Sequence, residues 1–373
     1  MDKRKQQLTI DLRMYRKSGI GRYLQTVLPD LIPLVNASRI RILCDPEDLN
    51  GESWTKDPRI EIRCFRAPIF SVAEQVAALG STYRDAGLLW VPQYNIPLLY
   101  RGGLLVTIHD LCQLAFPETL GNDLQRWYAR KLLSAVASRA NAVMCVSEFT
   151  ASEMQRYLGI DARRLTIAHP TVGSSWTRDN SVRSNESGRP YILAVGNIKK
   201  HKNLKRLIKA FDLIRGEIPH DLIVVGQQQG FMNSDPDLAS TVNLQDGRVR
   251  FTGYVSDAEL NSYYRNADLF VLPSIYEGFG FPVVEAMALG CPVACSNVSS
   301  LPEVAGDAAL FFDPNSVEDI GRVITEVLGD QDLRERLIER GRHRANTYRG
   351  NACARSTADV INRIMSADLE KDV

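Results

Sequence analysis

Short apolar runs alternate with stretches of helical periodicity along the whole chain. In the first half these runs are 8–12, 40–44, 88–91, 103–108 and 142–146, and in the second half they are 191–195, 222–225, 249–252 and 269–272. Runs of this length, separated by helical patterns, are typical of strands in parallel sheets. The pattern therefore predicts the α/β fold class, with two successive series of strands and helices.

A polar segment separates the two series. Residues 174–190 read SSWTRDNSVRSNESGRP, a composition that buries little apolar surface. We therefore predict that 174–190 is a linker between a domain at 1–173 and a second domain that begins at residue 191. A length of 373 residues agrees with two domains rather than one.

The composition is that of an ordinary globular protein, with 45% apolar and 24% charged residues. A net charge of +1 argues against nucleic acid as a partner. The seven cysteines are scattered and lack the spacing of a zinc site, so we expect free thiols in a reducing compartment. No apolar run approaches the roughly 20 residues of a membrane span, and no signal-peptide core follows the charged start. We therefore expect a cytoplasmic protein.

The most informative stretch follows the apolar run that ends at Pro273. Two carboxylates, Glu277 and Glu285, flank a glycine turn, which consists of Gly278, Phe279 and Gly280. A proline follows the turn, and Gly290 lies where a helix would end, so we expect a strand, a turn and a helix with Glu285 on its first turn. Backbone N–H groups at such a turn bind anions. The carboxylates accept hydrogen bonds from sugar hydroxyls, so the stretch indicates a nucleotide sugar.

This stretch, with Pro273-Ser before it and the runs 290–296 and 301–314 after it, resembles the retaining glycosyltransferases of family 4. The resemblance implies the GT-B fold, in which two Rossmann-like domains face each other across a cleft. Residues 1–173 would be the acceptor-side domain and 191–347 the domain that binds the nucleotide sugar. The segment 348–373 would hold a last helix, at about 353–365, that crosses back to the first domain.

The resemblance also implies roles in the second domain. Glu277 would contact the transferred sugar, Glu285 the ribose, and Lys202 the departing diphosphate. The other expected nucleotide-sugar contacts are Gly196, Asn197, Gly253, Tyr254, Val255, Gly278, Phe279 and Gly280. Relatives often carry an arginine near Lys202, whereas this chain has Asn197 and His201. For the segment around Lys202, the alternative is a solvated lysine-rich loop. For the segment 253–255, the alternative is a strand end followed by a helix with Ser256 or Asp257 as N-cap.

In the first domain, His109 ends an apolar run and matches the family position that hydrogen-bonds the transferred sugar. Gly19 and Gly21 would let the chain pass close to a substrate. The segment 92–97, together with 107–111, resembles the bacterial mannosyltransferase branch. On that basis Tyr94 and Asn95 are candidate contacts to the acceptor.

Two D-x-D patterns, at 235–237 and 330–332, do not follow apolar runs and are typical of capping or loop acids. We therefore expect no metal and no other cofactor. The segment 124–139 has helical periodicity with four basic residues and Trp127. Such a helix packs on its own sheet or rests on an anionic membrane, and the second alternative would make the protein peripheral to the inner face of the membrane.

These observations predict a retaining glycosyltransferase that transfers a hexose, foremost mannose from GDP-mannose. The acceptor would be a glycan or a lipid-linked oligosaccharide in surface-polysaccharide synthesis. The alternatives are a UDP- or dTDP-linked donor, a phosphorylase-like or synthase-like activity on stored glucan, and a nucleotide-sugar-binding protein without catalysis.

Overall fold

The computed structural model describes residues 6–77, 81–84, 86–173, 176, 188–226 and 247–370. The chain divides into two compact units. The first unit contains residues 1–171 and 350–373, and the second unit contains residues 172–349. Within the expected linker, Trp176 is buried and its ring contacts Tyr264 edge-on, with ring centroids 5.9 Å apart. Trp176 itself is therefore not solvated, whereas residues 174, 175 and 177–187 of the expected linker lie outside the described residues.

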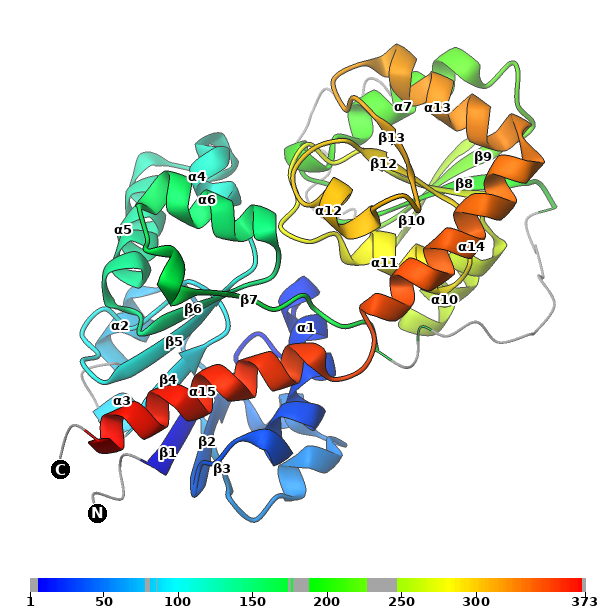
Figure 1. Cartoon of the computed structure of the whole chain (residues 1–373). Coiled ribbons are helices and arrows are strands. Elements are labelled where there is room, and N and C mark those ends of the chain that lie inside the picture. Colours follow the sequence, from blue (N-terminus) through cyan, green and yellow to red (C-terminus); the bar gives the residue numbers. More distant parts are fainter. Residues whose placement is uncertain are drawn as a thin grey trace. The chain divides into compact units, whose positions relative to one another are not determined.

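The first unit is built on a seven-stranded parallel sheet in the order β3-β2-β1-β4-β5-β6-β7 (Figure 1). Its strands are β1 (Gln7–Asp11), β2 (Arg39–Cys44), β3 (Ile60–Cys64), β4 (Leu88–Val91), β5 (Gly103–Ile108), β6 (Ala142–Cys145) and β7 (Leu165–Ile167). Its helices are α1 (Ser18–Leu31), α2 (Val72–Ala77), α3 (Ser81–Arg84), α4 (Cys112–Ala115), α5 (Asp123–Arg139), α6 (Glu148–Leu158) and α15 (Ala352–Glu370). The helices α5 and α6 supply Leu132, Leu133, Val136 and Met154 to the core on one face of this sheet.

The helix α15 belongs to the first unit although it ends the chain. It packs on α1, and both helices are visible beside the first sheet in Figure 1. The Asn362 side chain accepts a hydrogen bond from the Asn36 backbone N–H (2.8 Å) and donates one to the Leu34 carbonyl (3.1 Å).

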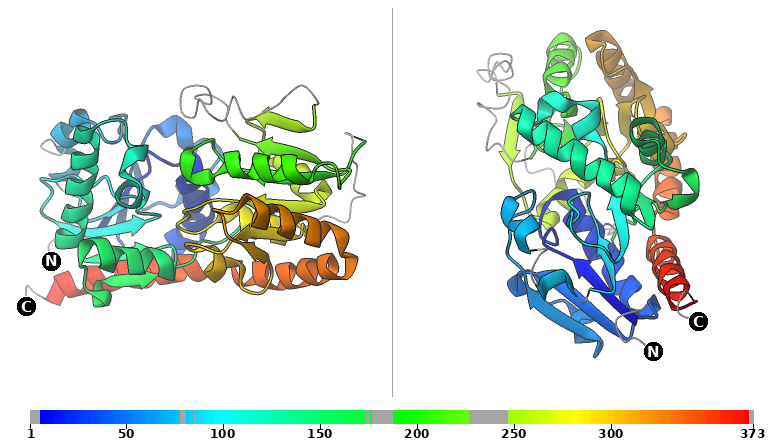
Figure 2. Two further views of the ribbon diagram at one scale, coloured as in Figure 1. Left: turned by 90° about the horizontal axis from the view of Figure 1, so that it is seen from above. Right: turned by 90° about the vertical axis from the view of Figure 1, so that its left-hand side faces the viewer.

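The second unit contains a six-stranded parallel sheet in the order β10-β9-β8-β11-β12-β13. Its strands are β8 (Tyr191–Val195), β9 (Asp221–Val225), β10 (Val249–Gly253), β11 (Leu269–Leu272), β12 (Val293–Ser296) and β13 (Leu310–Phe312). Its helices are α7 (Leu204–Ile214), α10 (Asp257–Asn266), α11 (Phe281–Ala288), α12 (Leu301–Ala305), α13 (Val317–Gly329) and α14 (Gln331–Thr347). Helices lie on both faces of this sheet, with α7 and α13 on one face and α10, α11 and α14 on the other (Figures 1 and 2).

The core of the second unit follows from helical spacing. On α7 the residues Leu204, Leu207, Ile208 and Phe211 repeat at intervals of three and four, so they share one face. That face packs against the sheet and against Ile320 and Ile324 of α13. Among the described residues, no helix is long and apolar enough to cross a bilayer.

Each apolar run in the sequence forms the predicted strand within one or two residues. The strands that the pattern missed are β3, β7, β12 and β13. The strand β3 lies at an edge of its sheet and alternates apolar with charged residues (Ile-Glu-Ile-Arg-Cys), so it has no continuous apolar run. The strands β7 and β13 have only three residues, which is too short for periodicity to identify, and β12 has four.

The loops after β8 and β9 approach each other closely at Gly226. A Cβ atom added there would lie 2.0 Å from the Gly196 carbonyl oxygen, so only glycine fits without a backbone shift. We expect Gly226→Ala to destabilise the second unit by about 1–3 kcal/mol, because the clash is with backbone and not with a flexible side chain. Gly216→Ala is the matched control, since nothing lies within 4 Å of its Cβ position. Thermal unfolding of both variants is the measurement, and equal unfolding temperatures would contradict the prediction.

Candidate active site

The candidate site of the second unit lies where its strand order reverses. The strands β8 and β11 are neighbours, but the chain leaves β8 towards β9 and leaves β11 towards β12. The connections after the two strands therefore lie on opposite faces of the sheet, and the carboxyl ends of such strands are where ligands bind in open α/β sheets. The loop after β8 carries Lys202, and the loop after β11 carries Glu277.

An ion pair joins these two loops. The Lys202 ammonium lies 2.6 Å from Glu277 Oε1, and the Ser274 hydroxyl donates a second hydrogen bond of 2.6 Å to the same oxygen. Both charged side chains are partly accessible, with 18% of Lys202 and 12% of Glu277 exposed. The structure thus brings together two residues that the sequence analysis assigned to one site, although they are 75 positions apart.

The main chain around Glu277 is fixed by two serines that follow β12. The Glu277 N–H donates to the Ser299 hydroxyl oxygen (3.1 Å), and the Ser300 hydroxyl lies 2.9 Å from the carbonyl oxygens of both Glu277 and Phe279. Gly280 is the N-cap of α11 with φ of 101°, a conformation that favours glycine. The turn that the sequence predicted is therefore held by side chains that the sequence analysis did not identify.

The buried Asn203 orders the loop that carries Lys202. Its side-chain amide donates to the carbonyl oxygens of Pro273 (3.0 Å) and Pro314 (2.7 Å), so it ties this loop to those that follow β11 and β13. The His201 carbonyl accepts a hydrogen bond from the Ile275 N–H (2.8 Å). His201 and Asn203 thus hold the loop against the turn, and the Lys202 side chain passes over Gly196.

The structure corrects the placement of Glu285. It is the fifth residue of α11 and so lies in the second turn, not the first. Only 1% of the residue is exposed, and its Oε2 accepts a hydrogen bond from the Tyr264 hydroxyl (3.0 Å). The helix itself ends as predicted, because Gly290 has φ of 74° and its N–H bonds to the Met287 carbonyl.

The other expected nucleotide contacts occupy loops at the same edge of the second sheet. Gly253 ends β10, Tyr254 is highly exposed, and Val255 is partly exposed. Ser256 caps α10 and forms a reciprocal capping box with Glu259, which decides between the two N-caps left open by the sequence. Asn197 is exposed in the loop after β8.

In the first unit, His109 follows β5. Its Nε2 lies 2.9 Å from the Pro92 carbonyl oxygen, which can only accept, so Nε2 carries the hydrogen and Nδ1 is the acceptor. The ring also contacts Tyr23 edge-on, with centroids 5.0 Å apart. Burial lowers the pKa of His109 to about 4, against the opposing effect of the Pro92 bond. At neutral pH the residue is therefore an uncharged hydrogen-bonding group.

The remaining candidates in the first unit differ in accessibility. Gly19 has open space around it, whereas a Cβ at Gly21 would lie 2.6 Å from the Tyr15 carbonyl oxygen, so Gly21 is needed for packing whether or not a substrate binds. Tyr94 is partly exposed. Asn95 is fully buried and its amide nitrogen donates a hydrogen bond to Glu74 (2.5 Å), and its contact with an acceptor stays a prediction.

The D-x-D patterns and the segment 124–139 are the remaining features for which the sequence gave an expectation. Asp330 caps α14 by accepting from the Leu333 N–H, as expected for a capping acid, whereas the pattern 235–237 lies outside the described residues. The predicted helix at 124–139 is α5, and it packs on its own sheet through Ala129, Leu132, Leu133 and Val136. Leu124 and Trp127 on α5 are exposed, and membrane contact stays a prediction.

Comparison with known proteins identifies the family. The profile of the Glycosyl transferases group 1 family matches residues 177–344, and that of Glycosyltransferase Family 4 matches residues 84–175. O-antigen chain mannosyltransferase B of Escherichia coli is 32% identical over 268 residues, which are 69% of this chain and 69% of that protein. The chain is a family 4 glycosyltransferase of the bacterial mannosyltransferase branch.

Further matches concern the extent of the similarity and the fold. Serotype-specific mannosyltransferase WbdA of Escherichia coli is 28% identical over 303 residues, which are 78% of this glycosyltransferase but only 36% of that relative. The structure of sucrose-phosphate synthase from Thermosynechococcus elongatus superposes with a TM-score of 0.73 at 18% identity, over 96% of this chain and 99% of that chain. The structure of Anabaena HepE in complex with UDP-glucose superposes with a TM-score of 0.69 at 14% identity, over 98% of this chain and 99% of that chain. These structural matches show the GT-B fold.

The neutral state of His109 gives a prediction about pH. Because its folded pKa of about 4 lies below the ordinary value of 6.5, the unfolded chain binds more protons between these values. The contribution to stability is therefore complete above pH 6.5 and is lost as the pH falls towards 4. We expect the difference in unfolding free energy between wild type and His109→Gln to shrink over that interval. A histidine proton signal in NMR spectra that titrates near pH 6.5 and vanishes in His109→Gln would refute this assignment.

Proposed function

We propose that this glycosyltransferase transfers mannose from GDP-mannose, with retention of anomeric configuration, to a mannose-containing glycan of an O-antigen. The observation that carries the proposal is the Lys202–Glu277 pair at the reversal point of the second sheet, in a chain 32% identical to an O-antigen chain mannosyltransferase. The acceptor glycan would be linked to a lipid, and the second unit would bind the donor.

The reaction first requires that the negative charge on the leaving diphosphate be stabilised. The bond between the anomeric carbon and the phosphate oxygen breaks, and the diphosphate gains negative charge. Lys202 and the backbone N–H groups of the turn at Gly278 and Gly280 would stabilise that charge. No metal is needed in this proposal, because a lysine and a helix N-terminus supply the positive potential.

Glu277 would stabilise the transferred sugar and not act as a nucleophile. Its Oε1 is already engaged by the Lys202 ammonium and the Ser274 hydroxyl, and both contacts lower the nucleophilicity of the carboxylate. The acceptor hydroxyl would attack from the side on which the diphosphate leaves, and its proton would pass to that diphosphate. Such a same-face route retains configuration without a protein nucleophile.

His109 of the first unit and Glu285 of the second unit have roles of their own in this proposal. The neutral His109 would accept a hydrogen bond from a hydroxyl of the transferred sugar through Nδ1. Glu285, one oxygen of which is held by Tyr264, would accept from the ribose hydroxyls. A UDP- or dTDP-linked sugar is the second candidate donor, because HepE, which shares the fold, binds UDP-glucose.

Donor identity can be tested by thermal unfolding with GDP-mannose, UDP-glucose and dTDP-glucose. A ligand at 100 times its Kd stabilises a protein by about 2.7 kcal/mol, so we expect a clear rise with GDP-mannose alone. Transfer of labelled mannose to methyl α-mannobioside should then proceed in the presence of EDTA. Stabilisation only by a UDP- or dTDP-linked sugar would reject GDP-mannose. Loss of transfer in EDTA that manganese or magnesium restores would reject the metal-free mechanism.

Substitution of Lys202 tests its role in stabilising the leaving group. Lys202→Ala should lower turnover by roughly tenfold or more, because its contact strengthens as the diphosphate leaves. Lys200→Ala, a change in the same loop at an exposed lysine, is the control and should have little effect. Near-normal turnover of Lys202→Ala would assign the leaving-group role to another residue.

The two glutamates should respond differently to substitution. Glu277→Ala should lower turnover strongly and leave GDP affinity nearly intact, because the sugar changes most at the transition state. Glu285→Ala should weaken binding of GDP itself, and Tyr264→Phe separates loss of the Tyr264 bond from loss of the carboxylate. Calorimetry with GDP and initial rates measure both effects. Equal losses of GDP affinity, together with retained turnover in Glu277→Ala, would show that the assigned roles are wrong.

A further inference from the structure

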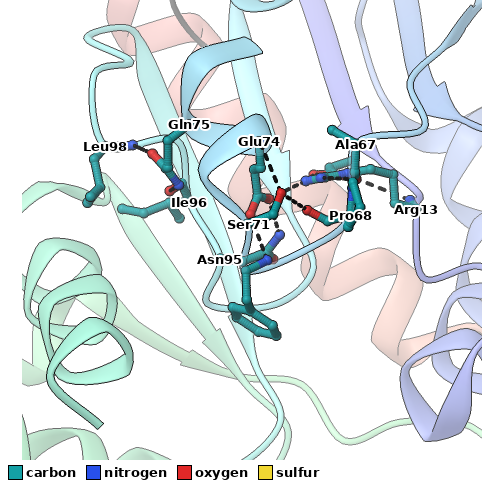
Figure 3. Close-up of polar contacts among 11 residues, drawn as sticks. Arg13, Ala67, Pro68, Ser71, Glu74, Gln75, Asn95, Ile96 and Leu98 are labelled. Carbon is teal, nitrogen blue, oxygen red and sulfur yellow. Dashed lines mark hydrogen bonds and ion pairs between the residues drawn. The ribbon is translucent and has the colours of Figure 1, made fainter. Parts of the chain in front are cut away.

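The sheet of the first unit reverses its strand order between β1 and β4, and a buried charge cluster fills this position. Arg13, just after β1, forms an ion pair with Asp11. It forms a second ion pair with Glu74 of α2 (Figure 3). Glu74 is completely buried, and Arg13 and Asp11 are nearly so. The place where ligands bind in open α/β sheets is therefore closed here by a carboxylate of the protein itself.

Glu74 connects three segments that are far apart in the sequence. Its Oε1 accepts from Arg13 (2.5 Å) and from the Asn95 amide (2.5 Å), and its Oε2 accepts from the Phe70 backbone N–H (2.9 Å). The neighbouring Gln75 bonds to the Ile96 carbonyl (3.2 Å) and to the Leu98 N–H (2.8 Å), as Figure 3 shows. The short helix α2 is thus fixed to the ends of β1 and β4 by buried polar contacts.

This arrangement holds Phe70 in an unfavourable conformation. Phe70 has φ of 59°, a region that a bulky residue other than glycine rarely adopts and that costs roughly 1–3 kcal/mol. The residue is nevertheless 39% exposed, so it gains little from burial. Its ring packs on Tyr94 with centroids 4.9 Å apart and planes inclined by 32°. Folding stability alone does not explain why an exposed phenyl ring is held in this conformation.

The loop that carries Tyr94 is anchored at two points. His109 bonds to the Pro92 carbonyl, and Glu74 bonds to Asn95. Tyr94 lies between these anchors, two residues from Pro92, and its ring also packs on the core of the first unit. The Phe70–Tyr94 pair is therefore a rigid aromatic surface, in which Tyr94 lies on the loop that His109 holds and Phe70 lies on the segment that Glu74 holds.

We propose that Phe70 and Tyr94 form a platform on which a sugar ring of the acceptor glycan stacks. The proposal rests on the proposed function. A pyranose ring has a flat face of C–H groups that packs on an aromatic face, so a fixed ring gives both affinity and orientation. A membrane surface would need apolar area but no fixed ring orientation, so a ring held at φ of 59° and packed on Tyr94 suits a sugar ring better than a membrane.

The test uses GDP-mannose and methyl α-mannobioside, a water-soluble acceptor without lipid. Phe70→Leu keeps apolar volume but loses the flat ring, and we expect it to raise the acceptor KM about tenfold or more, while the KM for GDP-mannose stays unchanged. Phe70→Trp, which keeps an aromatic face, should restore much of the acceptor affinity. Val72→Ala is the control, because that exposed side chain lies two residues away on α2.

A further variant separates a binding role from a packing role. Phe70→Gly removes both the ring and the backbone strain, so we expect the unfolding temperature to stay within about 3 °C of wild type while the acceptor KM rises. A large fall in unfolding temperature would assign Phe70 to packing and overturn the platform.

The remaining outcomes distinguish the platform from the proposed function. If wild type transfers mannose and Phe70→Leu has a normal acceptor KM, the platform is wrong and the proposed function stands. If Phe70→Leu instead loses only its binding to vesicles of phosphatidylglycerol and phosphatidylethanolamine, the ring contacts a membrane and the platform is again wrong. If wild type binds GDP-mannose but transfers nothing to methyl α-mannobioside, the mannose acceptor and the platform are both rejected.

Discussion

The contact between Lys202 and Glu277 determines how the second unit is organised at its candidate site. The two charges lie 2.6 Å apart and bridge the loops at the reversal point of the sheet. The positive charges of Lys199, Lys200 and Lys202 would repel one another without a nearby negative charge, and Glu277 supplies that charge. Because both side chains remain partly accessible, the diphosphate of the proposed donor would compete for Lys202 without opening the core. The loop is thus formed before any ligand binds, which lowers the entropic cost of binding.

The same topological position in the first unit has the opposite character. There Glu74 and Arg13 are sealed from solvent, and burial raises the pKa of Glu74 although Arg13 opposes this effect. Removing one partner of such a buried pair is costly, since it leaves an unpaired charge. The reversal point of the second sheet therefore remains accessible to a ligand, whereas that of the first sheet is filled by buried ion pairs that stabilise the fold. This difference supports a donor bound by the second unit and an acceptor held at the surface of the first.

Much of the fold was predictable because its signals are local. The apolar runs gave the positions of most strands, and the glycine turn, the proline and Gly290 gave the start and end of α11. The capping of α10 by Ser256 and that of α14 by Asp330 also depend on residues only three positions away. The edge strand β3 was missed because charged residues alternate with apolar ones in it and none of its five residues is buried, so it lacks the apolar run that marks a central strand.

The fold class could be predicted from the apolar runs along the chain, and the family and the candidate site residues Lys202, Glu277 and His109 could be predicted from short motifs. The tertiary structure, in contrast, sets what each side chain contacts. It placed Glu285 and Asn95 in the interior, brought Ser299 and Ser300 to the Glu277 backbone, and joined Phe70 to Tyr94. The physical reason is that these contacts connect loops after different strands, and strand order and register, which are not encoded within any one motif, set which loops meet.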